Sequence, residues 1–221
     1  MKSILKMLLS GFILMLGLWL LLFVPAGTLD HWNAWLFFAV IIISSWVSSL
    51  YLLRRSPDVL ERRMLATETR PVQKLLAGTN YLFWLALVVV SALDHRFGWS
   101  SVPTHISIVG FILILIAIVG ITLVFAQNTH AATTIRVEED QPLVSTGIYG
   151  RVRHPMYTFT TCLYLGTPLA LGSYWGLIFT IPAILIFALR IRDEEKLLKE
   201  ELFGYHDYIQ KVPHRLVPGI W

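Results

Sequence analysis

Residues Gly147–Tyr157, GIYGRVRHPMY, concentrate polar side chains at the start of a long apolar run. Pro155 fits the first turn of a helix, because its missing N–H costs no hydrogen bond there. It also disfavours the helical conformation for His154. Arg153 and His154 should therefore lie just before a helix N-terminus, where the helix dipole favours an anionic group. With Tyr157 two residues inside the helix, the pattern predicts a site for a charged ligand, although an interfacial belt of side chains would use the same residue types.

A second polar cluster follows the same apolar run, in the segment RIRDEEKLLKEELFGYHDY. Glu194 and Glu195 lie close to the end of the run, and Arg190 shares a helix face with Glu194 four residues later. A carboxylate beside cationic partners could pair with an arginine or hold hydroxyl and amino groups of a ligand. A solvated helix with i,i+4 ion pairs explains the spacing equally well, so both interpretations stay open.

The last residues form a third candidate segment, in which Pro213 and Pro218 bracket Arg215. Two prolines so close together favour an extended tail over a helix. Such a tail could fold back over the site and place Arg215 in it. Binding of a lipid phosphate by Arg215 is the alternative.

These polar segments belong to an apolar chain of 221 residues that is 56% hydrophobic and 14% charged. Soluble domains usually carry about 25% charged residues, so the composition predicts an integral membrane protein. The single cysteine, Cys162, excludes a disulfide framework within the chain and a multi-cysteine metal site. We expect no metal, because no histidine–carboxylate spacing suggests one. We also expect no nucleic-acid partner, because the distribution of charge described below explains the net charge of +4.

Five apolar runs must position the polar segments. Four of them are close to the roughly 20 residues that cross a bilayer as a helix. The fifth, Pro155–Leu189, is too long for one crossing, and Gly172-Ser173 at its centre predicts two helices joined by a tight turn. The chain is thus predicted to be all-α with about six transmembrane helices, the last two forming a hairpin. The four shorter runs are Met7–Val24, Trp32–Leu53, Leu75–Leu93 and Ile106–Phe125.

The basic residues orient these spans. With six crossings, 17 of the 18 Lys and Arg residues fall on one side, and only Arg96 falls on the other. The positive-inside rule therefore predicts that both termini are cytoplasmic. Lys2 and Lys6 precede an apolar run that is longer than the core of a signal peptide, which favours a retained membrane anchor.

The domain organisation follows from the same runs. We expect one membrane domain over residues 1–221, with four spans in residues 1–126 and the site-bearing region in residues 127–221. Residues 57–70, which mix Leu, Val and Met with charge, are predicted to form an interfacial amphipathic helix that contacts membrane lipids. The cytoplasmic site should combine the 127–154 connection with the C-terminal tail.

The ordered motifs of residues 127–221 resemble the isoprenylcysteine carboxyl methyltransferase family of integral membrane enzymes and the related phospholipid methyltransferases. The first four spans resemble that family only in general character. One departure is His206, which follows Tyr205 where the family often has an acidic residue before the tyrosine. The motifs are G-x-Y-x-x-x-R-H-P-x-Y (Gly147–Tyr157), PLALGS (Pro168–Ser173), R-x-x-x-E-E-x-x-L (Arg190–Leu198), FG-Y-x-x-Y (Phe203–Tyr208) and R-L-V-P (Arg215–Pro218).

The resemblance implies an S-adenosylmethionine site at the cytoplasmic face and methyl transfer to a lipophilic acceptor. Glu194 and Arg215 become candidate catalytic residues, with Arg215 orienting the acceptor. An aromatic face such as that of Tyr157 can stabilise a sulfonium cation. The implied cofactor-binding residues are Tyr149, Arg153, His154, Tyr157, Glu194 and Glu195.

Several alternatives stay open. A prenylcysteine carboxylate, a phospholipid amine and a small thiol would all suit a tunnel between the last two helices, near Phe159, Leu163, Tyr164 and Phe187, although simple apolar packing also explains these residues. An NADPH-dependent reductase of the sterol reductase type is a second enzyme class. A non-enzymatic membrane scaffold or small transporter is the remaining alternative, although the spans carry no charged residue at mid-depth. The sequence does not specify an oligomeric state.

Overall fold

The computed structural model describes residues 2–56, 68, 70–130 and 141–221, with side chains from residue 11 onward. The described residues are helical or irregular and include no strand. The predicted interfacial helix of residues 57–70 lies outside them, except for Glu68 and Arg70. The helices are α1 (Lys2–Ala26), α2 (Trp32–Arg55), α4 (Pro71–Phe97), α5 (Thr104–Gln127), α6 (Pro155–Ala170), α7 (Thr180–Glu201) and α8 (Tyr205–Lys211), with short 3-10 helices η1 (Gly147–Gly150) and η2 (Trp175–Phe179).

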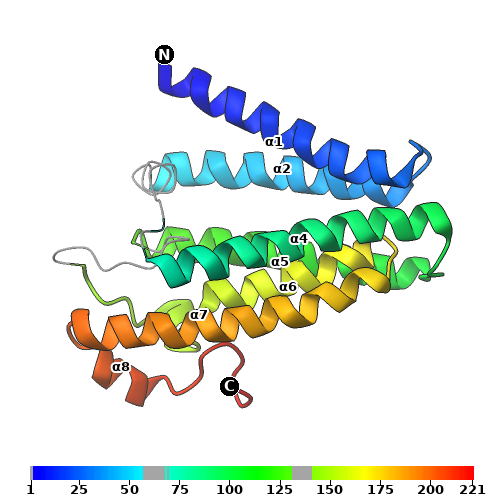
Figure 1. Cartoon of the computed structure of the whole chain (residues 1–221). Coiled ribbons are helices and arrows are strands. Elements are labelled where there is room, and N and C mark those ends of the chain that lie inside the picture. Colours follow the sequence, from blue (N-terminus) through cyan, green and yellow to red (C-terminus); the bar gives the residue numbers. More distant parts are fainter. Residues whose placement is uncertain (1, 57–67, 69, 131–140) are drawn as a thin grey trace.

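The long helices lie roughly along one common direction (Figure 1). Helices α4, α5, α6 and α7 form a bundle, α1 and α2 lie along one side of it, and α8 and the C-terminal tail lie on the other. The connections at residues 27–31, 98–103 and 171–174 fall at one end of the bundle. The segment after α5, η1 and α8 gathers at the opposite end. The polar segments singled out in the sequence therefore meet at one end of the molecule.

Four of the helical segments are long and apolar enough to cross a membrane: Trp32–Arg55, Pro71–Phe97, Thr104–Gln127 and Trp175–Glu201. Their outward-facing Leu, Ile and Val side chains are widely exposed, as expected for a surface that faces lipid. The prediction of an all-helical, multi-pass membrane protein is confirmed. The apolar part of α1 (residues 11–26) and the 16 residues of α6 are shorter, so the predicted total of six crossings stays a prediction.

The long apolar run breaks where the sequence predicted. Helix α6 ends at Ala170, and Gly172 follows with φ +77°, a left-handed conformation that glycine adopts without steric cost. Ser173 is buried there, and its hydroxyl donates to the carboxylate of Asp94 in α4. The chain then returns through η2 into α7, which runs back beside α6 (Figure 1).

Close packing against α5 holds α6 in place. A Cβ atom at Gly110 would lie 2.3 Å from the backbone nitrogen of Ala170, and one at Gly166 would lie 2.7 Å from the carbonyl oxygen of Gly110. Phe159 packs on Gly120 further along the same interface. Only residues without a side chain permit this backbone approach. The glycines therefore set the position of α6, which carries the start of the candidate site.

Candidate active site

The start of α6 is built as the sequence predicted. Pro155 is the first helical residue, and His154 before it has a non-helical conformation. The backbone N–H groups of Arg153 and His154 donate to the carbonyl oxygens of His214 and Arg215, at 3.0 and 2.9 Å. The C-terminal tail therefore folds back onto the entrance of α6, as predicted from its two prolines.

Two arginines and a histidine converge on Glu195 of α7. Its carboxylate lies 2.8 Å from the guanidinium of Arg153, 2.9 Å from that of Arg215 and 3.3 Å from Nε2 of His154. The Glu195 side chain is only 4% exposed, and Arg153 also donates to the carbonyl oxygen of Val212. This ion cluster joins α6, α7 and the tail, and it leaves Glu195 few lone pairs for a ligand.

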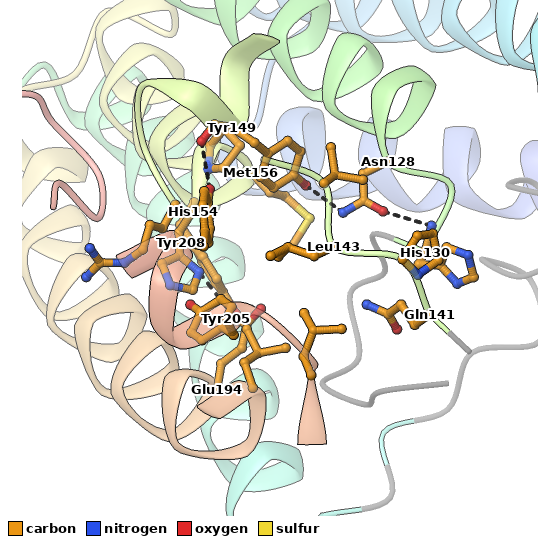
Figure 2. A pocket seen from close by; sticks show the side chains of 17 residues that line it. Asn128, His130, Gln141, Leu143, Tyr149, His154, Met156, Glu194, Tyr205 and Tyr208 are labelled. Carbon is orange, nitrogen blue, oxygen red and sulfur yellow. Dashed lines mark hydrogen bonds and ion pairs between the residues drawn. The ribbon is translucent and has the colours of Figure 1, made fainter. Parts of the chain in front are cut away.

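A cleft opens beside the ion cluster (Figure 2). It contains about 770 Å³ of space not filled by protein atoms, part of which is open to solvent. Its lining includes Asn128, His130, Gln141, Leu143, Tyr149, Arg153, His154, Met156, Tyr157, Glu194, Leu198, Tyr205 and Tyr208.

Five of the predicted cofactor-binding residues line this cleft: Tyr149, Arg153, His154, Tyr157 and Glu194. Glu195 and Arg215 are not among the lining residues. Arg215 is held by Glu195 and lies over the ring of Trp221, 5.2 Å from its centroid. The predicted roles of these two residues toward cofactor and acceptor stay predictions.

Glu194 is the carboxylate that faces the cleft. It accepts a hydrogen bond from the Tyr157 hydroxyl at 3.0 Å and lies 3.9 Å from Nδ1 of His154. Its side chain is 23% exposed, compared with 4% for Glu195. The difference leaves Glu194 able to accept hydrogen bonds from a ligand in the cleft.

Tyrosines from two segments add neutral hydroxyl groups. The pKa of Tyr149 is raised to about 12, mainly by burial of its hydroxyl group. The hydrogen bond from Asn128 lowers this pKa, and the Glu194 carboxylate raises it further. Tyr208 donates to the carbonyl oxygen of Tyr149 at 2.7 Å and so ties α8 to η1. Burial raises the pKa of Tyr205 far above its usual value near 10.

The hydroxyl of Tyr205 has unused hydrogen-bonding capacity. It is buried and has no hydrogen-bond partner among the described residues, although Tyr205 lines the cleft. Buried polar groups are rarely left unpaired. Tyr205 and Tyr208 belong to the FG-Y-x-x-Y motif, which by itself indicated no role for them. Their spacing of three residues, which puts both on one face of a helix, was the available signal.

The residue types in the cleft fit S-adenosylmethionine. Its amino and ribose hydroxyl groups need acceptors such as the Glu194 carboxylate, and its carboxylate needs donors such as the hydroxyl of Tyr205. A sulfonium cation is attracted to aromatic faces, which Tyr149 and Tyr157 present. Figure 2 shows Tyr149 and His154 on one side of the cleft, His130 and Gln141 on the other, and the thioether of Met156 between them.

A second cavity lies against the first, on the side of α4. It shares Met156 and Tyr157 with the cleft, so these two side chains form a common wall. Tyr164 and Phe187 line it, as the predicted tunnel requires, whereas Phe159 packs on Gly120 in α5 instead. The full lining is Ala77, Asn80, Tyr81, Met156, Tyr157, Thr160, Tyr164, Phe187 and Arg190.

Arg190 gives this second cavity its positive charge. The side chain is largely buried, donates to Gln73 at 3.1 Å and lies 4.0 Å from the carboxylate of Glu68. Its guanidinium carbon is 5.9 Å from the centroid of the Tyr157 ring. Arg190 thus lies close to the common wall. Its spacing in the sequence had indicated only a shared helix face with Glu194.

Comparisons with known proteins agree with these features. A family model described as phospholipid methyltransferase matches residues 106–205. A probable protein-S-isoprenylcysteine O-methyltransferase of Oryza sativa subsp. indica is 27% identical over 197 residues, which cover 85% of this chain and 97% of the relative. The protein-S-isoprenylcysteine O-methyltransferase of Schizosaccharomyces pombe is 40% identical over 78 residues; this match spans 34% of this chain and only 33% of the yeast protein.

The fold has a solved counterpart in a eukaryotic intramembrane Ras methyltransferase, isoprenylcysteine carboxyl methyltransferase. The alignment has a TM-score of 0.55 and 20% identity, and it covers 92% of this chain and 74% of that one. At this identity the likeness shows a shared fold. The family model and the sequence relatives add the link to methyltransferases. The predicted resemblance of the chain to the isoprenylcysteine carboxyl methyltransferase family of integral membrane enzymes is therefore confirmed.

Proposed function

We propose that the protein transfers a methyl group from S-adenosylmethionine to the carboxylate of a prenylcysteine-type acceptor. The observation that carries this proposal is the pair of adjoining cavities. One is a polar cleft at the end of the bundle, the other is a mainly apolar cavity beside α4, and Met156 and Tyr157 separate them. Such a pair lets a water-borne donor and a lipid-borne acceptor meet.

In this proposal the cleft holds the cofactor, which supplies an electrophilic methyl group when bound. Glu194, His154 and Tyr205 offer hydrogen-bonding groups, and Tyr149 and Tyr157 offer aromatic faces. Holding donor and acceptor in register supplies much of the rate in a displacement of this kind. The chain therefore acts chiefly by positioning the two reactants.

The second cavity takes the acceptor. Exposed Tyr81 lies at its edge on α4, so an acceptor could enter from the lipid side of that helix. The aromatic rings of Tyr164 and Phe187 suit an isoprenoid chain. Arg190, which lies close to the common wall and 4.0 Å from the carboxylate of Glu68, provides a positive charge for the acceptor carboxylate.

The same proposal gives the molecule six crossings, with α6 and α7 as a membrane-spanning hairpin. The cleft then faces the cytoplasm, because 17 of the 18 Lys and Arg residues fall on that side. This places the site where S-adenosylmethionine is available in solution.

Calorimetric titration tests the cofactor. Purified protein in detergent is titrated with S-adenosylhomocysteine and, separately, with NADPH. We expect saturable binding of the former only, weakened about tenfold or more by Glu194→Ala, since a buried charged hydrogen bond is lost. Glu200→Ala, an exposed carboxylate six residues further along α7, is the matched control and should bind as the wild type does.

Methyl transfer from labelled S-adenosylmethionine then tests the acceptor. N-acetyl-S-farnesylcysteine and phosphatidylethanolamine are offered in the same vesicles, and we expect label in the first alone. Transfer to phosphatidylethanolamine would show that the acceptor is a lipid amine and not a carboxylate, as the name of the family model suggests. Binding of NADPH alone by folded protein would refute the methyltransferase proposal.

A further inference from the structure

Asn80 of α4 is a buried polar residue with an unsatisfied atom. The residue is 5% exposed, and its side-chain Oδ1 has no hydrogen-bond partner among the described residues. A buried amide oxygen is seldom left unpaired, because losing its hydrogen bonds with water is unfavourable. Oδ1 is therefore available to a donor on a molecule that enters the site.

The position of Asn80 identifies the space from which that donor comes. Asn80 lines the cavity beside α4, together with Met156 and Tyr157 of the common wall. Its backbone carbonyl oxygen accepts a hydrogen bond from Tyr164 at 3.0 Å, and Thr180 donates to the carbonyl oxygen of Tyr164 at 3.1 Å. These bonds hold this turn of α4 against α6 and α7. Asn80 is therefore held at the cavity by packing from two other helices.

We propose that Asn80 selects acceptors that carry an amide N–H beside the reacting carboxylate, by accepting that N–H at Oδ1. The inference rests on the proposed function. In a C-terminal prenylated cysteine, the α-carbon carries both the carboxylate and the amide nitrogen. When the carboxylate reaches the common wall near Arg190, the amide N–H lies only a few bonds away.

This contact gives the cavity a chemical preference that apolar packing cannot supply. A fatty acid presents a carboxylate and a long apolar chain, but it has no donor for Oδ1. A site built to bond a substrate N–H rejects an analogue without it, because the buried acceptor of the site is then left unpaired. Asn80 thus distinguishes a peptide-derived carboxylate from the abundant carboxylates of free fatty acids.

Two acceptors that differ in one group test the proposal. N-acetyl-S-farnesylcysteine carries the amide, and S-farnesyl-3-mercaptopropionate has the same carboxylate, thioether and isoprenoid chain without it. We expect Asn80→Leu to raise KM for the amide acceptor about five- to tenfold, the value of one hydrogen bond, and to leave KM for the second acceptor within about twofold. Asn80→Ala must show the same selectivity, which separates loss of the Asn80 side-chain amide from a change in the shape of the cavity.

Thr79→Leu is the matched control, since Thr79 precedes Asn80 in α4 and lines neither cavity. It should leave both KM values and the affinity for S-adenosylhomocysteine at wild-type levels. Equal losses with both acceptors in the Asn80 variants would mean a structural role, and no loss with either would mean that water satisfies Oδ1. Both results overturn the inference and leave the proposed function intact. If the wild type binds S-adenosylhomocysteine but methylates neither acceptor, the acceptor class and this inference both fail, while the cofactor assignment stands.

Discussion

At the scale of single residues, the cleft depends on hydroxyl and carboxylate groups whose neighbours do not fully satisfy them. Glu194 has one hydrogen bond from Tyr157 and keeps part of its carboxylate exposed. Tyr205 has a buried hydroxyl without a partner among the described residues. Arg153 and Glu195, in contrast, satisfy one another and the tail. The first pair is therefore suited to bind a ligand and the second to hold the site together.

Tyr205→Phe separates ligand binding from stability. We expect the affinity for S-adenosylhomocysteine to fall about three- to tenfold, because one hydrogen bond to the ligand is lost. The melting temperature of the ligand-free protein should stay the same or rise, since the variant removes an unpaired buried hydroxyl. Calorimetry and thermal unfolding measure the two effects, with the exposed Tyr174→Phe as control. A lower melting temperature with unchanged affinity would instead indicate a structural partner for the hydroxyl.

His31, at the opposite end of the bundle, predicts a pH dependence of stability. It is 2% exposed and stacks on His95 with ring centroids 3.6 Å apart. Burial, with a smaller contribution from His95, lowers the pKa of His31 to about 4 from a usual value near 6.5. The unfolded chain therefore binds a proton more readily, so this stability is complete above pH 6.5 and is lost as the pH falls toward 4.

The expected loss is about 2 kcal/mol of unfolding free energy between pH 6.5 and pH 4. Thermal unfolding across this range, compared between wild type and His31→Leu, isolates the contribution of His31 from those of the other histidines. The variant should lose less stability on acidification than the wild type. Parallel curves for the two proteins would show that His31 accepts a proton in the folded state.

At the scale of elements, Glu195 holds the start of α6 and the C-terminal tail to α7. Glu195→Gln removes the charge that pairs with the buried Arg153 and with Arg215. We expect about 3–5 kcal/mol of destabilisation, because a buried cation is left without its partner. Trypsin should also cleave faster at Lys211 and Arg215 as the tail detaches. Glu200→Gln, at an exposed position of the same helix, is the control.

The same variant decides between two interpretations of Glu195. An unchanged melting temperature and a protected tail, combined with a loss of affinity for S-adenosylhomocysteine, would restore the cofactor role implied by the family resemblance. Loss of stability without the ligand would assign the residue to the ion cluster. The burial of its carboxylate among Arg153, His154 and Arg215 favours the second outcome.

At the scale of the whole molecule, the orientation of the bundle places the cleft on one side of the membrane. Cysteine labelling tests this in a Cys162→Ala background, since Cys162 is the single cysteine of the chain. We expect a membrane-impermeant maleimide to reach Asp207→Cys in α8 only in inside-out vesicles, and Ser101→Cys between α4 and α5 only in right-side-out vesicles. Labelling of both from the same side would contradict an odd number of crossings between these positions.

The sequence by itself determined the helical segments and the class of the protein. The length of an apolar run and the position of Pro155 or Gly172 are local properties, because each acts through the backbone of its own segment. The observed helices consequently begin and end within a few residues of the predicted runs. The ordered motifs after residue 146 carried the family resemblance, which the sequence relatives support.

The tertiary structure alone decided which of these residues line the cleft. Glu194 and Glu195 are neighbours in sequence, but successive residues of a helix point about 100° apart, so one faces the cleft and the other the ion cluster. Arg215, which is predicted to orient the acceptor, is held by Glu195. Asn80 meets Tyr164, 84 residues away, at a cavity that no local pattern reveals. Contacts of this kind depend on how the helices are rotated and packed against one another. At the α5–α6 interface this packing depends on close contacts at the glycines, which exist only in the folded chain.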